Sequence, residues 1–384
     1  MSLAARADSA STLKLRLSPV AVFVFASRIA LTAAAIAGAR SRVGGPNEGV
    51  GGTGPGWMRA WTSYDANWYV EIARAGYDRP PTTAFFPVMP MLMRLASPLV
   101  GLVTRTDGEL SLAISGILIS TIAFACALVL IHRETTDAYS QTVADRSILV
   151  LALLPFALTW QAVYTESLTL LLLALLWMAL RRRQTIPAVA AAIAVGATRS
   201  VGIPIGIGLL LAHLGWPFLQ RRRPKWDETL AGGAALLSSG AALVWLGREG
   251  GGVGAQAYFG RALSCPWVPV WRDLTGVGGY QLGSITSLLA IGVGTAFICA
   301  RHEPPEWRIA VAVMFLMHLT MARQVPAYTI GAARYLMPMY PVAVWLARYS
   351  TRLSRPVLVG CGTLAIATAL ICAYGAGQGA FNLG

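Results

Sequence analysis

A single carboxylate stands in an aromatic cluster near the start of the chain. Asp65 lies in the segment 63–69, which reads SYDANWY, and the segment 84–87, AFFP, follows shortly after it. A carboxylate that loses hydration among aromatic rings is suited to take a proton from a hydroxyl group. We therefore predict Asp65 as a catalytic base. The same residue also fits the first turn of a short amphipathic helix, where it would cap backbone N–H groups.

Two arginines lie where apolar sequence is broken or resumes, Arg199 and Arg334. Arg199 interrupts an apolar stretch from 186 to 219, and Gly196 and Gly202 flank it. A hairpin at this point would let the guanidinium reach an anion, because arginine stays charged and holds phosphate oxygens through paired hydrogen bonds. Arg334 opens a later apolar stretch and is predicted to bind the same anion. The alternatives are a topological stop or an internal ion pair for Arg199, and contact with lipid headgroups for Arg334.

Two further charged residues interrupt apolar sequence. Glu166 stands in the segment 163–167, VYTES, between two apolar runs with almost no loop. Charged groups at membrane depth are costly and face a cavity or a partner, so Glu166 and Tyr164, two residues before it, are candidates for substrate binding. Support of the turn by opposing the helix dipole explains Glu166 equally well. Arg28 lies in the middle of the first apolar run, where we expect a partner acid or a cavity.

Composition assigns the chain to the integral membrane proteins. It has 384 residues, of which 55% are hydrophobic and only 12% charged, whereas soluble domains are about 25% charged. The net charge of +14 comes from basic residues that punctuate apolar runs. This is typical of topology signals and not of a surface that binds nucleic acid. The four histidines are scattered and four of the five cysteines lie in apolar runs, so we predict no metal site and no cofactor.

Hydropathy predicts an all-α, polytopic protein with about eleven membrane-spanning helices, in one domain over residues 1–384. The predicted spans are 19–39, 109–131, 146–161, 163–180, 186–198, 200–219, 229–247, 283–300, 307–322, 334–348 and 356–375. Lys and Arg accumulate in the cytoplasmic connections of membrane proteins, and here the basic clusters fall on one side of the alternation. The amino terminus is therefore predicted to be cytoplasmic, and two long loops, 40–108 and 248–282, to be extracytoplasmic. Prolines and Arg94 break the apolar residues 86–103, which favours an interfacial helix within the first loop.

The motifs of the first outer loop and the later charged residues follow one another in a recognisable order. They are DANWY at 65–69, IA at 72–73, GY at 76–77, AFFP at 84–87, YTESL at 164–168, TRSVG at 198–202 and RY at 334–335. The chain thus resembles the GPI mannosyltransferase 2 (PIG-V) family, as a prokaryotic member within the GT-C superfamily of membrane glycosyltransferases. The resemblance extends from about residue 19 to residue 350, and its most specific part is 65–87.

The resemblance implies a transfer reaction on lipid-linked substrates. Members of the superfamily use a polyprenyl-phosphate sugar donor and carry an acid in the first outer loop as base, a role that maps onto Asp65. The implied reaction is an inverting transfer of mannose from polyprenyl-phosphate mannose to a glycolipid acceptor. It would take place at the extracytoplasmic face of the cell membrane, in contact with membrane lipids. Arg199 and Arg334 would offset the charge that develops on the phosphate without a metal. Trp68 and Tyr69 would form the platform on which the sugar stacks.

Two alternatives stay open at this point. A GT-C transferase for another sugar, such as glucose or arabinose, would carry the same motifs. A secondary transporter or lipid flippase would also bury Arg and Glu in its spans and break helices near a midplane site. The sequence shows no convincing repeat between its halves, and its charged residues gather at one face and not midway. This distribution favours the enzyme.

Overall fold

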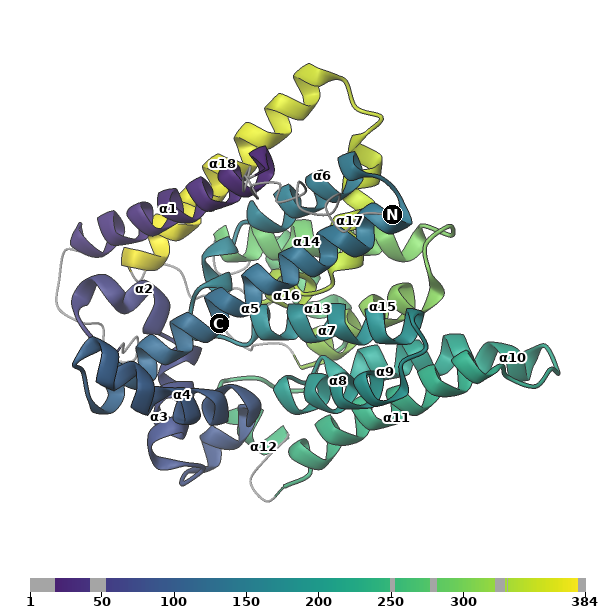
Figure 1. Cartoon of the computed structure of the whole chain (residues 1–384), viewed down its shortest axis with the longest axis horizontal. Coiled ribbons are helices and arrows are strands. Elements are labelled where there is room, and N and C mark those ends of the chain that lie inside the picture. The colour runs from purple at the N-terminus through teal and green to yellow at the C-terminus, as the bar shows by residue number, and fades with distance from the viewer. Residues whose placement is uncertain are drawn as a thin grey trace, which may run out of the picture.

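Helices joined by turns make up the part of the chain that the computed structural model describes, namely residues 18–41, 53–248, 253–276, 282–321, 329 and 331–378 (Figure 1). The all-α class predicted from hydropathy is confirmed. The amino-terminal Lys14 and Arg16, and the parts of the two outer loops at 42–52, 249–252 and 277–281, lie outside the described residues.

The helices of the first half of the chain surround the first outer loop. They are α1 (Pro19–Arg40), α2 (Arg59–Thr62), α3 (Asp65–Ala75), α4 (Val88–Thr104), α5 (Gly108–Ala138), α6 (Gln141–Ala152), α7 (Glu166–Arg181) and α8 (Thr185–Thr198). A 3₁₀ turn, Ala157–Trp160, lies between α6 and α7. The described part of the predicted first loop, from residue 53 on, therefore contains the α-helices α2, α3 and α4 and the 3₁₀ helices Gly56–Met58 and Pro80–Ala84.

The second half of the chain begins with a pair of helices that are joined by a π-helical turn, Leu211–Gly215. Its helices are α9 (Gly202–Leu210), α10 (Trp216–Leu219), α11 (Trp226–Leu246), α12 (Val253–Tyr258), α13 (Trp267–Leu274), α14 (Leu282–Cys299), α15 (Pro305–Thr320), α16 (Ala332–Leu336), α17 (Tyr340–Ser350) and α18 (Arg355–Gln378). Two of them, α12 and α13, belong to the predicted second outer loop.

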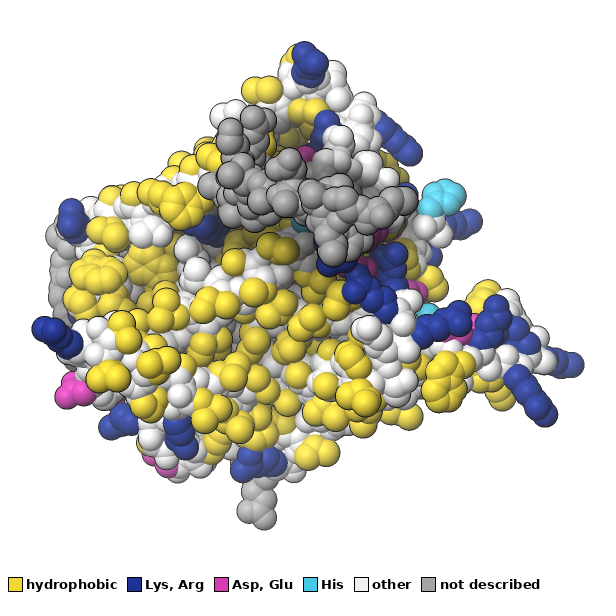
Figure 2. Space-filling model, in the orientation of Figure 1, with side chains coloured by type: hydrophobic (Ala, Val, Ile, Leu, Met, Phe, Trp, Pro, Cys, Tyr) yellow, Lys and Arg dark blue, Asp and Glu magenta, His cyan; other side chains and the backbone are white. Residues whose placement is uncertain are grey.

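Several helices have the length and apolar composition of membrane spans. Among the described residues, five are long enough to cross a bilayer: α1, α5, the continuous helix Gly202–Leu219, α11 and α18. Shorter apolar helices lie at Val88–Thr104, Thr185–Thr198 and Ser284–Cys299. Hydrophobic side chains cover much of the face seen in Figure 2, which is expected of a surface that contacts lipid. The chain is therefore a multi-pass membrane protein, and each predicted span overlaps at least one helix of the structure.

Two predicted spans are interrupted where the prediction made them continuous. The span 146–161 ends as an α-helix at Ala152, shortly before Pro155, and the chain continues through the 3₁₀ turn. The span 334–348 is divided into α16 and α17, with Pro338 in the break. Proline lacks the backbone N–H and its ring clashes with the preceding turn, so the helix ends in front of it. The second break lies four residues after Arg334.

Small residues allow the first and the last described helix to pack closely. The first and last described helices, α1 and α18, run along each other (Figure 1). A Cβ atom at Gly38 or at Gly377 would collide with the backbone of the opposing helix. Close approach at small residues is the usual way in which membrane helices associate, because lipid tails remove the hydrophobic drive between apolar faces.

Arg28 is held by backbone carbonyls, which corrects the expectation of a partner acid or a cavity. Its Nη1 donates to the carbonyl of Ala157 at 2.7 Å, and its Nη2 donates to the carbonyl of Ala152. The guanidinium also lies over the ring of Phe124, 5.5 Å from its centroid. The last carbonyls of a helix have no intrahelical partner and carry negative partial charge. The last carbonyl of α6 and the first carbonyl of the 3₁₀ turn after it therefore bind Arg28 in place of a carboxylate.

The basic connections meet at one end of the molecule. Ion pairs join Arg182 after α7 to Glu134 in α5, at 2.7 Å, and Arg183 to Asp227 in α11, at 3.4 Å. A further pair joins the end of α17 to the connection between α14 and α15. In Figure 2 the dark-blue side chains around α10 mark part of this end. The described clusters that the positive-inside rule placed on one side are thus neighbours in space, and α7, which begins with Glu166, runs from the opposite end to this one.

Candidate active site

The candidate base begins a helix but does not cap it. Asp65 is the first residue of α3, and Tyr64 before it occupies the cap position with φ 58° and ψ −124°. A positive φ is uncommon for a bulky residue, and such strain is concentrated at functional sites. The Asp65 carboxylate, about one-third exposed at 32%, accepts a hydrogen bond from Nη1 of Arg334 at 3.0 Å. The capping alternative for Asp65 is therefore wrong.

Side chains from the turn before α7 and from α4 hold α3 in place. At its start, the hydroxyl of Tyr164 donates to the carbonyl of Ser63 at 3.1 Å. At its end, Nε of Arg94 in α4 donates to the carbonyl of Ala73 at 2.7 Å. Because the last carbonyls of α3 lack intrahelical partners, a cation at that end is favourable. The position of Asp65 is thus fixed from both ends of its helix.

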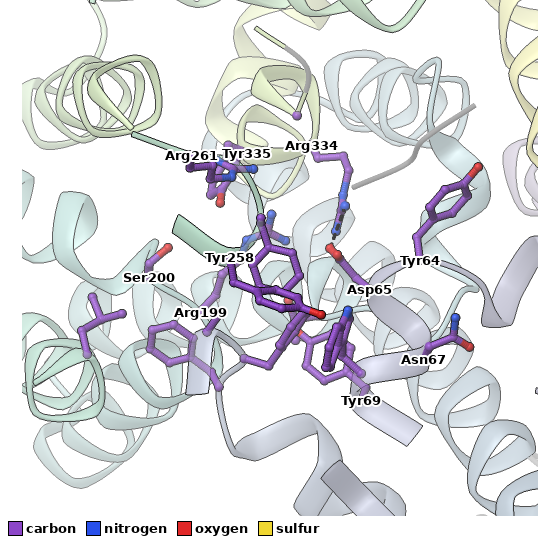
Figure 3. A pocket seen from close by; sticks show the side chains of 18 of the residues that line it. Tyr64, Asp65, Asn67, Tyr69, Arg199, Ser200, Tyr258, Arg261, Arg334 and Tyr335 are labelled. Carbon is purple, nitrogen blue, oxygen red and sulfur yellow. Dashed lines mark hydrogen bonds and ion pairs between the residues drawn. The ribbon is translucent and has the colours of Figure 1, made fainter. Parts of the chain in front are cut away.

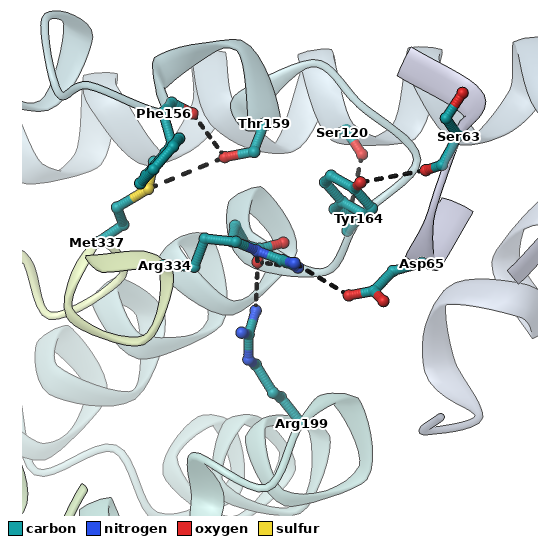
Figure 4. Close-up of polar contacts among 10 residues, drawn as sticks. Ser63, Asp65, Ser120, Phe156, Thr159, Tyr164, Arg199, Arg334 and Met337 are labelled. Carbon is teal, nitrogen blue, oxygen red and sulfur yellow. Dashed lines mark hydrogen bonds and ion pairs between the residues drawn. The ribbon is translucent and has the colours of Figure 1, made fainter. Parts of the chain in front are cut away.

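A buried carboxylate joins the two predicted arginines. Oε1 of Glu166 lies 2.6 Å from Nη1 of Arg199, and 2.6 Å from Nη2 and 2.7 Å from Nε of Arg334 (Figure 4). The side chain of Glu166 is completely buried. Since Arg334 also contacts Asp65, one guanidinium bridges the two carboxylates. Glu166 is therefore the counter-charge of both arginines in this structure. This role is neither the predicted contact with substrate nor the alternative, opposition to the helix dipole alone.

The hairpin predicted around Arg199 is present between α8 and α9. Arg199 itself is extended, with φ −162° and ψ 154°, and follows the last residue of α8. A Cβ atom on Gly202 would lie 2.6 Å from the Cα atom of Gly196, so the turn can close only with glycine there. The guanidinium stacks over the ring of Tyr335, 4.6 Å from its centroid. The two glycines let Arg199 leave the helix pair and turn toward the site.

These residues surround a cavity of about 690 Å³. Asp65, Trp68, Tyr69, Arg199 and Arg334 all line it (Figure 3), whereas the other two predicted residues do not. This volume is in the range of small-molecule sites, which combine apolar walls with a few polar groups. Five of the seven predicted site residues are thus brought together around one space.

Tyr164 and Glu166 lie behind the cavity and not on its wall. Tyr164 is 1% and Glu166 0% exposed, and neither lines the cavity. The guanidinium of Arg334 lies over the ring of Tyr164, with its Cζ atom 4.5 Å from the ring centroid. Both residues therefore position cavity-lining groups in this structure, and their direct contact with substrate stays a prediction.

Aromatic rings form one wall of the cavity. Trp68 stacks on Phe85 with ring centroids 5.8 Å apart and an interplanar angle of 19°. Trp68 also makes T-shaped contacts with Tyr258 and Phe259, with ring centroids 6.1 and 5.7 Å apart. Tyr69 is buried beneath them, and burial together with the Asp65 charge raises the pKa of its phenol well above the ordinary value. The Tyr69 hydroxyl therefore stays protonated, and it can donate a hydrogen bond but cannot serve as a base.

The second outer loop contributes residues that the sequence analysis did not identify. Tyr258, Phe259 and Arg261 all line the cavity and come from the end of α12 and the turn after it. The sequence offered one signal, the segment YFGR at 258–261. It repeats in the second loop the combination of aromatic and charged residues that marked the first.

No metal site can be assigned among the residues that the structure describes. No group of three or more His, Cys, Asp or Glu side chains lies close enough together there to hold an ion. The carboxylates of the site are instead paired with arginines.

Comparison with known proteins adds a family to this geometry. The family model described as mannosyltransferase (PIG-V) matches residues 17–212, just over half of the chain. Among solved structures, ArnT from Cupriavidus metallidurans bound to undecaprenyl phosphate is 13% identical, with a TM-score of 0.48 over 94% of this chain and 76% of that one. The Archaeoglobus fulgidus oligosaccharyltransferase in complex with Zn and sulfate is 15% identical, with a TM-score of 0.43 over 91% of this chain and 53% of that one. Similarity at these TM-scores supports no inference about mechanism, and no curated protein sequence matches the chain.

Proposed function

Because the chain belongs to the PIG-V family of mannosyltransferases, we propose that it moves a mannosyl residue from polyprenyl-phosphate mannose to a hydroxyl of a lipid-linked acceptor. The observation that carries the proposal is the carboxylate of Asp65, which faces a cavity together with arginines and an aromatic wall. A base, an anion-binding group and an apolar surface are what a glycosyl transfer between two lipids requires.

The proposed step is a single displacement at the anomeric carbon. Asp65 accepts the proton of the acceptor hydroxyl while the oxygen forms a bond to the anomeric carbon. The bond from that carbon to the phosphate oxygen breaks on the opposite face, and the electron pair leaves with the phosphate. One displacement inverts the configuration, so a β-linked donor gives an α-mannoside. The phosphodiester becomes a phosphomonoester and gains negative charge, which guanidinium groups around the cavity offset.

We further propose that the cavity opens on the extracytoplasmic side and that the amino terminus is cytoplasmic. The grouping of the basic connections at the end opposite Glu166 supports this orientation, because such connections are retained in the cytoplasm. Cysteine labelling tests it. A single cysteine placed by Asp78→Cys, in a chain freed of its five natural cysteines, should react with an impermeant reagent outside intact cells. Labelling only after permeabilisation would reverse the orientation.

Transfer by the purified protein tests the reaction. The wild-type chain in lipid vesicles should transfer radiolabelled mannose from synthetic polyprenyl-phosphate mannose to a glycolipid fraction of its own host membranes. Asp65→Asn should reduce the rate by about 10²- to 10⁴-fold, the usual contribution of a general base, while Asp78→Asn, a half-exposed acid of the same loop, should leave it unchanged. Full activity in the Asp65→Asn variant would place the base elsewhere. Transfer from glucosyl or arabinosyl donors in preference to the mannosyl donor would replace the proposed sugar.

A further inference from the structure

Arg261 is a cavity-lining cation from the second outer loop. It follows α12 by three residues and is partly buried. In Figure 3 its side chain lies beside Tyr335, on the side of the cavity that also holds Arg199 and Ser200. Asp65 and Asn67 lie on the other side of that view.

The other cavity-lining charges are already paired with one another. Arg334 uses all three of its guanidinium nitrogens, Nε and Nη2 on Glu166 and Nη1 on Asp65. Arg199 uses only Nη1, on Glu166. Arg334 is thus held between two carboxylates and keeps one N–H on each Nη outside these ion pairs, whereas Arg199 is held by one carboxylate oxygen and keeps four N–H groups to offer.

Arg261 adds a positive charge that these carboxylates do not balance. Glu71, the remaining acid on the cavity wall, pairs with Arg79. Within the described part of the chain, Arg261 has no carboxylate at ion-pair distance. Three arginines at positions 199, 261 and 334 thus face two carboxylates at 65 and 166, which leaves one excess positive charge. A site of this balance attracts an anion.

Arg199 and Arg261 converge on the same tyrosine. The guanidinium of Arg199 stacks on the Tyr335 ring, and the side chain of Arg261 lies beside Tyr335 in Figure 3. Ser200 also lines the cavity. The two guanidiniums, with the hydroxyls of Tyr335 and Ser200 on the same side of the cavity in Figure 3, provide N–H and O–H donors that a phosphate group accepts.

We infer that Arg261 and Arg199 bind the phosphate of the polyprenyl-linked donor, and that Arg334 is a positioning residue which holds the Asp65 carboxylate toward the acceptor. The inference rests on the proposed function and revises the predicted phosphate contact of Arg334. It places the leaving phosphate and the base on opposite sides of the cavity, which is the arrangement that a displacement with inversion requires. It also gives the second outer loop a direct part in donor binding.

Direct binding of the leaving group tests this inference without any need for turnover. The purified protein in detergent is titrated with undecaprenyl phosphate and, separately, with undecaprenol, which has the same chain and no phosphate. Arg261→Gln should weaken binding of the phosphate by about 10- to 100-fold, the usual contribution of a charge-assisted hydrogen bond, and should leave binding of undecaprenol unchanged. Arg261→Lys should retain part of the affinity. Arg248→Gln is the matched control, because Arg248 lies in the same loop but does not line the cavity.

Kinetics separate the two arginine roles. Arg261→Gln should raise the donor KM more than it lowers kcat, and Arg334→Gln should lower kcat with a smaller effect on phosphate binding. Wild-type phosphate affinity and donor KM in Arg261→Gln would overturn the inference, and would return the phosphate to Arg334 if Arg334→Gln lost that affinity. A wild-type protein that binds undecaprenyl phosphate no better than undecaprenol and transfers no mannose would instead overturn the proposed function itself.

Discussion

Replacement of Glu166 by glutamine separates a buried counter-charge from a substrate-binding group. The carboxylate is fully buried and lies 2.6 Å from a guanidinium nitrogen of Arg199 and of Arg334. Glutamine has nearly the same shape but no charge, so both guanidiniums lose their main counter-charge. Removal of one partner from a buried ion pair costs about 3–5 kcal/mol, because the other charge is left uncompensated in a region of low dielectric. We expect Glu166→Gln to unfold at a clearly lower temperature and to lose activity.

The same chemical change at Asp65 should act differently. The Asp65 side chain is 32% exposed, and Arg334 keeps its contacts with Glu166 when the Asp65 charge is removed. A pair with one exposed member contributes about 0–1 kcal/mol after screening by solvent. Asp65→Asn should therefore unfold within a few degrees of the wild type while transfer is lost. Glu166 and Asp65 both contact the guanidinium of Arg334. Glu166→Gln should nevertheless lower mainly the stability of the fold, whereas Asp65→Asn should lower mainly the rate of transfer.

Two measurements distinguish the variants. The first is thermal unfolding in detergent, followed by the fluorescence of the twelve tryptophans. The second is mannose transfer at a temperature where all variants are folded. A double variant, Glu166→Gln with Arg199→Gln, should recover part of the lost stability, since it removes an uncompensated charge. The reasoning is refuted if Glu166→Gln unfolds at the wild-type temperature and only raises a KM. That result would mean that Glu166 contacts substrate and that the arginines are held by other groups.

Three further substitutions test the packing that supports the site, each by thermal unfolding. Gly202→Ala should destabilise the protein by about 1–3 kcal/mol, because its Cβ meets the backbone of the neighbouring helix, whereas Gly233→Ala, with open space around the new atom, should be neutral or slightly stabilising; equal effects would contradict the close contact. Tyr164→Phe should cost about 1 kcal/mol and lower kcat modestly, since the carbonyl of Ser63 loses its donor; an unchanged kcat would show that α3 is positioned without this bond. Arg28→Met should cost about 1.5–3 kcal/mol for the lost charged hydrogen bonds, and a wild-type unfolding temperature would argue against carbonyl binding as its role.

The helices and the grouping of basic connections were predictable because each depends on a short stretch of sequence: an apolar run for a helix and a basic cluster for a connection. Apolar runs of sufficient length become helices in a bilayer whatever surrounds them, since every backbone polar group must be paired within its own segment. The segments at 146–161 and 334–348 were predicted as continuous although Pro155 and Pro338 were visible in the sequence. The break in each was therefore readable, and hydropathy was given more weight than the missing N–H of proline.

The partners of the buried charges were not predictable from local sequence. Arg334 lies 168 residues from Glu166 and 269 residues from Asp65 along the chain, and nothing in the composition near any of them specifies that pairing. Arg28 shows a different limit. Its acceptors are main-chain carbonyls, which every residue possesses, so no side-chain signal marks them. Arg261 was missed because a lone arginine in a loop is usually a solvated residue, and only the fold brings it to the cavity.

The site is assembled from helix ends, and this links its chemistry to the packing of the whole bundle. Asp65 and Glu166 each begin a helix, Arg199 directly follows one, and Arg334 lies in the short α16 next to a proline break. The path of a chain can turn sharply only where a helix stops, so these positions let side chains leave the bundle and converge. Each guanidinium is then held by a carboxylate from a different helix, and a shift of any one helix along its axis would separate atoms now 2.6–3.0 Å apart. For this reason a substitution at a helix contact far from the cavity, such as Gly38 against α18, should affect transfer only through stability, whereas one between α8, α9 and α11 moves Arg199 itself.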